Sequence, residues 1–85
     1  MRLYVGNLPF AIDDAMLREL FAPHGALMTA EVVCDKYTGQ SRGFGFVEFS
    51  ESAAGESAIA ALDGSEIEGR RIRVSIARPP RQFGS

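Results

Sequence analysis

The sequence predicts an α+β domain whose strands and helices follow the order βαββαβ. Four stretches alternate apolar and polar residues as half-buried strands do, and two stretches between them repeat apolar residues at helical spacing. Proline, glycine and an Asp-Gly pair separate these stretches. Right-handed crossovers would place the first and third strands side by side in the centre of a four-stranded antiparallel sheet, in the order 4-1-3-2. Both helices would cover one face and leave the other face in solvent.

The third strand, residues 42–49, has aromatic residues at a spacing of two. Successive side chains of a strand point to opposite faces, so Phe44 and Phe46 share one face with Glu48. The other face consists of Gly43, Gly45, Val47 and Phe49. Because Val47 makes a better core contact than Glu48, we expect both Phe rings to face solvent. Two exposed aromatic rings on one strand indicate a binding surface.

The first strand, residues 2–7, alternates in the same way. Leu3 and Val5 share one face, and Tyr4 and Gly6 share the other. Tyr4 is therefore expected beside Phe44 and Phe46 on the open face. Pro9 ends the strand.

The first helix is expected to begin after the N-cap Asp13 and to run to about Ala22, where Pro23 and Gly25 stop it. Its apolar stripe consists of Leu17, Leu20 and Phe21. This stripe has the spacing of a helix with one buried face.

The second helix is expected to begin at a cap provided by Ser50 or Ser52 and to end at Asp63-Gly64 in a left-handed cap. Its stripe consists of Gly55, Ala58, Ile59 and Leu62. Glycine inside a helix costs about 1 kcal/mol relative to alanine. Gly55 therefore indicates close contact between this helix and the sheet.

The second and last strands are expected at residues 26–35 and 71–77, with a polar loop at 36–41 and a short strand and turn at 66–70. The side chains expected to face the core are Ala30, Val32, Cys34, Ile72, Val74 and Ile76. Those expected to face solvent are Glu31, Val33, Arg73, Ser75 and Ala77. Cys34 is expected to pack as a small hydrophobe.

Composition and charge limit the class of protein. Eighty-five residues make one domain, expected at residues 1–79 with a flexible tail at 80–85. No apolar run is long enough to span a membrane, no signal segment is visible, and the single Cys34 cannot form an internal disulfide. We therefore expect a cytoplasmic chain. The net charge of −2 argues against strong nonspecific binding of polyanions, although five arginines lie in the last sixteen residues.

Residues 42–49, Arg-Gly-Phe-Gly-Phe-Val-Glu-Phe, match every specified position of the longer signature of the RNA recognition motif family. Residues 3–8, Leu-Tyr-Val-Gly-Asn-Leu, resemble the family's shorter signature, and residues 35–42 resemble its usual loop. The chain is similar to this family over residues 2–79, and it most resembles small single-motif RNA-binding proteins of bacteria. The resemblance implies a ferredoxin-like sandwich that binds single-stranded RNA on the open face of its sheet.

The resemblance also assigns roles to individual residues. Tyr4 and Phe44 should each stack a base, Phe46 should contact sugars, and Arg42 should meet a phosphate. Lys36 and Gln40 would close over the strand from the loop. The residues expected to bind RNA are Tyr4, Asn7, Lys36, Arg42, Phe44, Phe46, Arg73, Ser75, Ala77 and Arg78. The last four would line the edge where base identity is read.

Several charged residues have a second interpretation. Arg42 would otherwise form a surface ion pair with Glu48 or Glu31, and Arg73 and Arg78 would be ordinary solvated charges. Arg70 and Arg71 are interpreted as solvated charges at a turn, and His24 as a structural residue. Because Glu31 and Glu48 face the proposed RNA side, base stacking should contribute more to binding than phosphate attraction does.

Two other functions are open to a small α+β domain, catalysis and protein binding. An enzyme would need a clustered base, nucleophile or anion cradle, and one His with one Cys does not supply it. We therefore expect no catalytic residues, no metal and no cofactor. A protein–protein interaction module is the alternative function, but such modules usually lack the sheet aromatics that this chain keeps. The expected partner is single-stranded RNA, with single-stranded DNA as a second possible ligand, bound by a monomer in post-transcriptional RNA regulation or RNA chaperoning.

Overall fold

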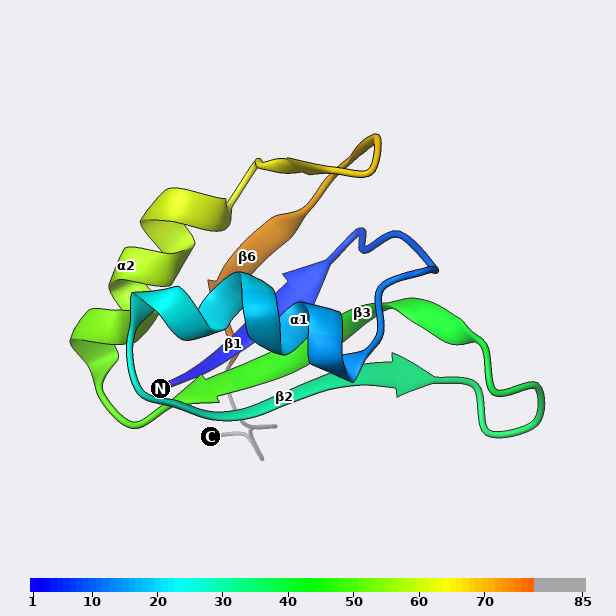
Figure 1. Ribbon diagram of the computed structural model, residues 1–85, viewed down its shortest axis with the longest axis horizontal. Coiled ribbons are helices and arrows are strands. Elements are labelled where there is room, and N and C mark those ends of the chain that lie inside the picture. The colour runs from blue at the N-terminus through cyan, green and yellow to red at the C-terminus, as the bar shows by residue number, and fades with distance from the viewer. Residues whose placement is uncertain (78–85) are drawn as a thin grey trace, which may run out of the picture.

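Two α-helices cover one face of a four-stranded antiparallel sheet in the computed structural model, which describes residues 1–77 (Figure 1). The sheet has the order β2-β3-β1-β6. Its strands are β1 (Arg2–Gly6), β2 (Leu27–Cys34), β3 (Ser41–Phe49) and β6 (Arg73–Ile76). The predicted βαββαβ fold and the strand order 4-1-3-2 are confirmed. The predicted domain end at 79, the tail at 80–85 and Arg78 lie outside the described residues.

The core lies between the helices and the inner face of the sheet. Leu3, Val5, Val47 and Phe49 from the central strands have no solvent exposure. The helices and the chain around them add Leu8, Leu17, Phe21, Ala58 and Ile72, also fully buried. The predicted alternation of the two central strands is therefore confirmed, and the opposite side chains of these strands face solvent.

Helix α1 (Asp14–Phe21) begins as its sequence predicts. The Asp13 Oδ1 accepts a hydrogen bond from the Met16 amide at 2.9 Å, which satisfies one of the free N–H groups of the first turn. A second carboxylate at this end of the helix bonds to the sheet: the Asp14 Oδ1 accepts a hydrogen bond from the Val32 amide of β2 at 2.7 Å. A short 3₁₀ helix, η1 (Ala22–His24), follows α1. These contacts fasten the start of α1 to β2.

Helix α2 (Ser52–Leu62) begins differently from the prediction. Its N-cap is Glu51 without a side-chain hydrogen bond, so neither Ser50 nor Ser52 caps it. The Ser50 amide donates to the Ala26 carbonyl at 3.1 Å, which ties Ser50 to the chain before β2, and the extended residue next to the helix is Glu51. At the other end Gly64 has a positive φ of +83°, as predicted for this glycine. The predicted left-handed cap is not formed, however, because Asp63 is extended and the Gly64 amide donates to the Ile72 carbonyl at 2.8 Å, away from the helix.

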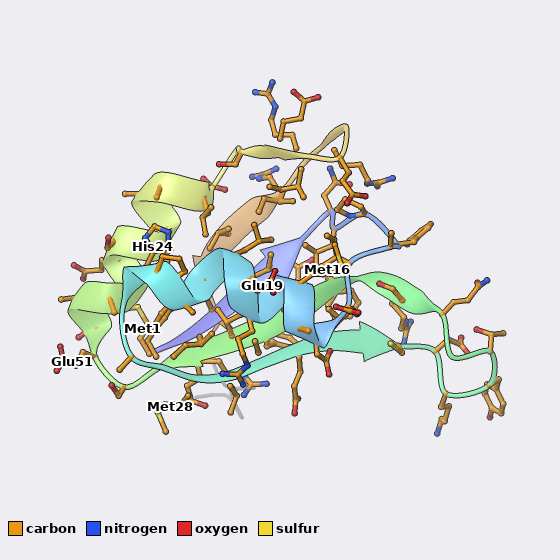
Figure 2. All side chains as sticks on the ribbon, viewed as in Figure 1. Met1, Met16, Glu19, His24, Met28 and Glu51 are labelled. Carbon is orange, nitrogen blue, oxygen red and sulfur yellow. The ribbon has the colours of Figure 1, made fainter. Side chains whose placement is uncertain are left out.

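Gly55 makes room for the N-terminal residue. A Cβ atom at Gly55 would collide with the Met1 Sδ, and Figure 2 shows Met1 beside α2. The Met1 amino group donates to the Phe49 carbonyl at 2.7 Å. The predicted close approach is thus made through the Met1 side chain at the start of β1.

The C-terminal part of the fold contains an additional hairpin, β4 (Glu66–Ile67) with β5 (Arg70–Arg71). The prediction of one strand from 71 to 77 is wrong at its start, because Arg71 pairs with Glu66 and β6 begins at Arg73. Glu68 and Gly69 both have positive φ and turn the chain back on itself.

Two residues predicted to face the core are exposed. Ile76 is 50% exposed, because β6 is an edge strand and Ile76 is its last residue. Cys34 is exposed because the β2–β3 register shifts between Val32 and Cys34, which breaks the alternation at the end of β2. No helix within residues 1–77 is long and apolar enough to cross a membrane.

Candidate nucleic-acid interface

Three aromatic rings form one surface on the open face of the sheet. Tyr4 of β1 pairs in register with Phe46 of β3, and their ring centroids are 5.9 Å apart. Phe44 lies 5.8 Å from Tyr4 and 6.1 Å from Phe46. All three side chains are partly exposed, whereas Leu3 and Val47 beside them point to the core. We call the rings of Tyr4, Phe44 and Phe46 the aromatic platform.

The position of the Tyr4 ring depends on Gly6. A Cβ atom at Gly6 would lie 2.7 Å from the Tyr4 Cε2 and Oη atoms, so the ring extends over the glycine. Carbon atoms normally remain about 3.5–4.0 Å apart. Any side chain at Gly6 would therefore displace the ring.

Arg2 contributes a positive charge to the platform. Its guanidinium carbon lies 4.7 Å from the centroid of the Phe46 ring, within the range of a cation–π contact. The sequence interpretation missed this residue. Alternation along β1 contained the signal, because Arg2 is two residues before Tyr4 and therefore lies on the same face.

Two carboxylates flank the platform, as predicted. Glu31 pairs in register with Phe46, and Glu48 pairs with Arg2. Within residues 1–77 the ion pair at 4.0 Å between Arg73 and Asp63 is the only one, so neither carboxylate is bridged to Arg42. The alternative interpretation of Arg42 as an ion-pair partner of Glu31 or Glu48 is therefore not supported. Its side chain is exposed at the start of β3.

The loop between β2 and β3 is organised by Asp35 and projects from the rest of the molecule (Figure 1). The Asp35 Oδ1 accepts hydrogen bonds from the Tyr37 amide at 2.7 Å and the Thr38 amide at 3.0 Å. The amide hydrogen bonds, Thr38 first, and the positive charge of Arg42 lower the pKa of the Asp35 carboxyl below its ordinary value of 3.8. Lys36 extends along this loop, with its Nζ atom 6.0 Å from the centroid of the Tyr37 ring.

A recess of about 360 Å³ adjoins the platform on the side of β6. It is lined by Tyr4, Gly6, Asn7, Asp63, Arg73, Val74 and Ser75. Ser75 pairs with Tyr4 and Arg73 pairs with Gly6, so both predicted β6 residues lie beside the first strand. Ala77, after the end of β6, is half-buried, and its amide donates to the Arg2 carbonyl at 2.9 Å.

Asn7 connects the end of β1 to the C-terminal hairpin. Its Nδ2 donates to the Arg71 carbonyl at 2.8 Å, and its Oδ1 accepts from the Arg70 Nη2 at 2.6 Å. Arg70, which the sequence interpretation treated as a solvated charge, is thus exposed but held in place. Within residues 1–77 no group of three or more His, Cys, Asp and Glu side chains could hold a metal ion.

The chain is similar in sequence to chloroplastic and mitochondrial RNA-binding proteins of plants. It is 51% identical to the chloroplastic 28 kDa ribonucleoprotein of Spinacia oleracea over 96% of its length, covering 36% of that protein. It is 47% identical to the mitochondrial glycine-rich RNA-binding protein 2 of Arabidopsis thaliana over 98% of its length, covering 55% of that protein. The chain thus spans about a third to about half of the length of these relatives.

These relatives correct two expectations from the sequence. The prediction of a cytoplasmic chain is contradicted, because its close relatives are chloroplastic or mitochondrial ribonucleoproteins. The resemblance to bacterial single-motif proteins is likewise unsupported, because these relatives are plant proteins.

Solved structures share the fold. The second RRM domain of the yeast poly(U)-binding protein superposes with a TM-score of 0.85 at 32% identity, over 95% of this chain and 98% of that one. The Sxl-lethal protein in its RNA complex gives a TM-score of 0.84 at 35% identity, over 89% of this chain and 47% of that one. A family model described as RNA recognition motif matches residues 3–73, and the chain therefore belongs to the RNA recognition motif family.

Proposed function

We propose that the chain binds single-stranded RNA by stacking bases on the aromatic platform. The observation that supports this proposal is the group of three partly exposed rings, with centroids 5.8–6.1 Å apart, on the side of the sheet away from the core. Bases of single-stranded RNA expose π-faces, and each stacked base contributes about 1–3 kcal/mol. The names of the relatives, which include ribonucleoproteins and RNA-binding proteins, agree with this function.

The roles of the residues follow from their places around the platform. Tyr4 and Phe44 each stack a base, while Phe46, with one face near Arg2, contacts sugars. Arg42 binds a phosphate at the start of β3. The proposed edge residues are Arg73, Ser75, Ala77 and Arg78. Lys36 in the loop between β2 and β3 and Asn7 after β1 are proposed as further RNA contacts. The proposed binding unit is a monomeric domain of residues 1–79 that also tolerates single-stranded DNA.

The electrostatics favour stacking over phosphate attraction. The net charge is −2, and Glu31 and Glu48 flank the platform. Each phosphate contact with single-stranded nucleic acid contributes about 0.7 to the slope of log affinity against log salt. Two phosphate contacts, by Arg42 and Arg2, give a slope of about −1 to −2, below that of a strongly basic RNA-binding protein.

The test is a titration with short random-sequence RNA, followed by fluorescence anisotropy. The double variant Phe44→Ala plus Phe46→Ala should bind at least about tenfold more weakly than the wild type, because it loses one stacked base and one sugar contact. Met28→Ala is the matched control, since Met28 is 56% exposed and Figure 2 shows it away from α1 at the end of the sheet near Met1. Equal affinity of the double variant and the wild type would refute the stacking surface.

The alternative function is protein binding, and the candidate surface for it lies on the helical side of the sheet. A recess of about 340 Å³ between α1 and β4 is lined by Ile12, Met16, Glu19, Leu20, Ile67 and Glu68. Figure 2 shows Met16 and Glu19 on α1, on the side of the sheet that carries the helices. NMR shifts on adding RNA separate the two functions: shifts confined to the platform strands support RNA binding there, and shifts confined to α1 contradict it.

The proposed role involves RNA binding and no catalysis. Binding by stacking requires no general base, nucleophile or cofactor, and the RNA recognition motif relatives are named for binding RNA. We propose that the protein acts in post-transcriptional RNA regulation or RNA chaperoning. In such a role the bound RNA is released chemically unchanged, and analysis of the RNA after incubation by gel electrophoresis tests this.

A further inference from the structure

Phe10 is a large apolar side chain that the platform does not include. It lies in the loop between β1 and α1 and is 69% exposed, although most residues of its size and type are buried. An exposed phenylalanine in a loop beside a nucleic-acid interface is a candidate contact residue. Sequence alternation gave no indication of it, because Phe10 belongs to neither a strand nor a helix.

The Phe10 ring is held in place by the neighbouring chain. The Leu8 amide donates to the Gly43 carbonyl at 2.8 Å, which joins this loop to the start of β3. The Phe10 Cε1 atom lies 3.3 Å from the position that a Gly43 Cβ would occupy. Gly43 has φ +86°, a conformation that favours glycine, so the close approach of the ring and the backbone conformation both depend on this residue.

A positive charge lies over the ring. The Arg70 guanidinium carbon is 5.8 Å from the Phe10 ring centroid, and the same guanidinium donates to the Asn7 Oδ1 at 2.6 Å. Asn7 in turn donates to the Arg71 carbonyl at 2.8 Å. The arginine is therefore orientated by β5 and the end of β1. It remains exposed and can also contact a phosphate.

This ring and charge continue the aromatic platform. Gly43, against which the Phe10 ring lies, is the residue before Phe44 on β3. Asn7, which holds Arg70, lines the same recess as Tyr4. In Figure 1 the loop after β1 lies at the end of the sheet where β3 begins. An RNA strand that leaves the platform at this end meets Phe10 and Arg70 next.

We propose that Phe10 and Arg70 form an additional nucleotide-binding subsite at this end of the platform. The Phe10 ring stacks on a base with the face that Arg70 leaves free, and the Arg70 guanidinium binds the adjoining phosphate. The proposal rests on the proposed RNA-binding function. It implies that the RNA site is at least one nucleotide longer than the platform itself.

A length series of RNA separates this subsite from the platform. A random-sequence dinucleotide occupies only the platform, whereas an octanucleotide also reaches Phe10. Phe10→Ala should weaken octanucleotide binding about five- to tenfold by loss of one stacked base, and should leave dinucleotide binding, measured by NMR titration, unchanged. Phe10→Tyr should restore octanucleotide binding, since it keeps the ring. Met28→Ala, with a similarly exposed apolar side chain on β2, should not change either.

The results that would overturn the subsite are distinct from those that would overturn RNA binding. Wild-type affinity of Phe10→Ala for the octanucleotide, or equal loss on both RNA lengths, would refute the subsite while leaving the platform intact. An unchanged affinity of the variant Phe44→Ala plus Phe46→Ala would refute the platform instead. Arg70→Gln removes the positive charge. Weaker octanucleotide binding in Arg70→Gln with an unchanged unfolding midpoint supports the phosphate contact, and wild-type binding refutes it.

Discussion

Replacing Gly6 by alanine should weaken RNA binding without weakening the fold. The new Cβ would lie 2.7 Å from the Tyr4 Cε2 and Oη atoms and 2.9 Å from its Cζ. Because unstrained contacts are about 3.5–4.0 Å long, the end of the Tyr4 ring has to move by about 1 Å. These atoms are the far end of a partly exposed side chain, so the ring can move while the backbone of β1 stays in place.

The magnitude follows from the stacking that the ring provides. Full loss of one stacked base costs about 1–3 kcal/mol. Since Gly6→Ala displaces the Tyr4 ring and does not remove it, we expect the lower half of this range, about a tenfold rise in Kd. Alanine in a strand is favoured over glycine by about 0.5–1 kcal/mol, so the free energy of unfolding should be equal or slightly higher.

A double-mutant cycle with Tyr4→Ala checks the mechanism. RNA affinity is measured by fluorescence anisotropy and stability by urea unfolding for the wild type, both single variants and the double variant. If Gly6 acts through the Tyr4 ring, Gly6→Ala has no further effect once the ring is absent. A wild-type affinity of Gly6→Ala, or the same loss in the Tyr4→Ala background, would refute this reasoning.

Two further predictions concern the β2–β3 pair. Gly45→Ala should lower the free energy of unfolding, measured by urea unfolding, by about 1–3 kcal/mol. The new Cβ would collide with the Glu31 carbonyl oxygen, and this backbone atom cannot move aside as the end of a side chain can. A free energy of unfolding equal to that of the wild type contradicts the prediction. The second prediction concerns the pH dependence of the loop between β2 and β3. The Asp35 carboxylate accepts hydrogen bonds from the Thr38 and Tyr37 amides, and its pKa is lowered below 3.8. These hydrogen bonds therefore stabilise the loop above pH 3.8 and are lost as the pH falls through the lowered pKa. NMR shifts of both amides should therefore titrate with a midpoint below 3.8 in the wild type and not in Asp35→Asn, and a midpoint above 3.8 contradicts the assignment.

The platform was predictable because two strong rules apply to it. Alternation along a strand assigns Phe44, Phe46 and Tyr4 to the face opposite the apolar residues. Crossover handedness then places their strands side by side, and the observed pairing of Tyr4 with Phe46 agrees. The N-cap at Asp13 was equally predictable, since the side chain and the amide that it binds are three residues apart.

Predictions failed where a residue's environment is determined by residues far away in the sequence. Strict alternation would bury Cys34 and Ile76, but a register shift before Cys34 and the edge position of Ile76 leave both exposed. The predicted cap of α2 by Ser50 or Ser52 failed because the Ser50 amide is hydrogen-bonded to the Ala26 carbonyl and the N-cap position falls on Glu51. The cytoplasmic prediction failed for another reason. The residues that fold this domain do not determine its cellular compartment, and its relatives are chloroplastic or mitochondrial.

The sequence by itself determined the fold class, the core faces of the central strands and the three platform rings, because periodicity acts over a few neighbouring residues. Tertiary structure alone decided what surrounds those rings. The Tyr4 ring over Gly6, the Arg2 charge at Phe46 and the Phe10–Arg70 pair depend on side-chain rotamers, strand register and loop conformation. These contacts join residues up to about sixty positions apart, as in Arg70 with Phe10, and only the folded chain brings such residues together.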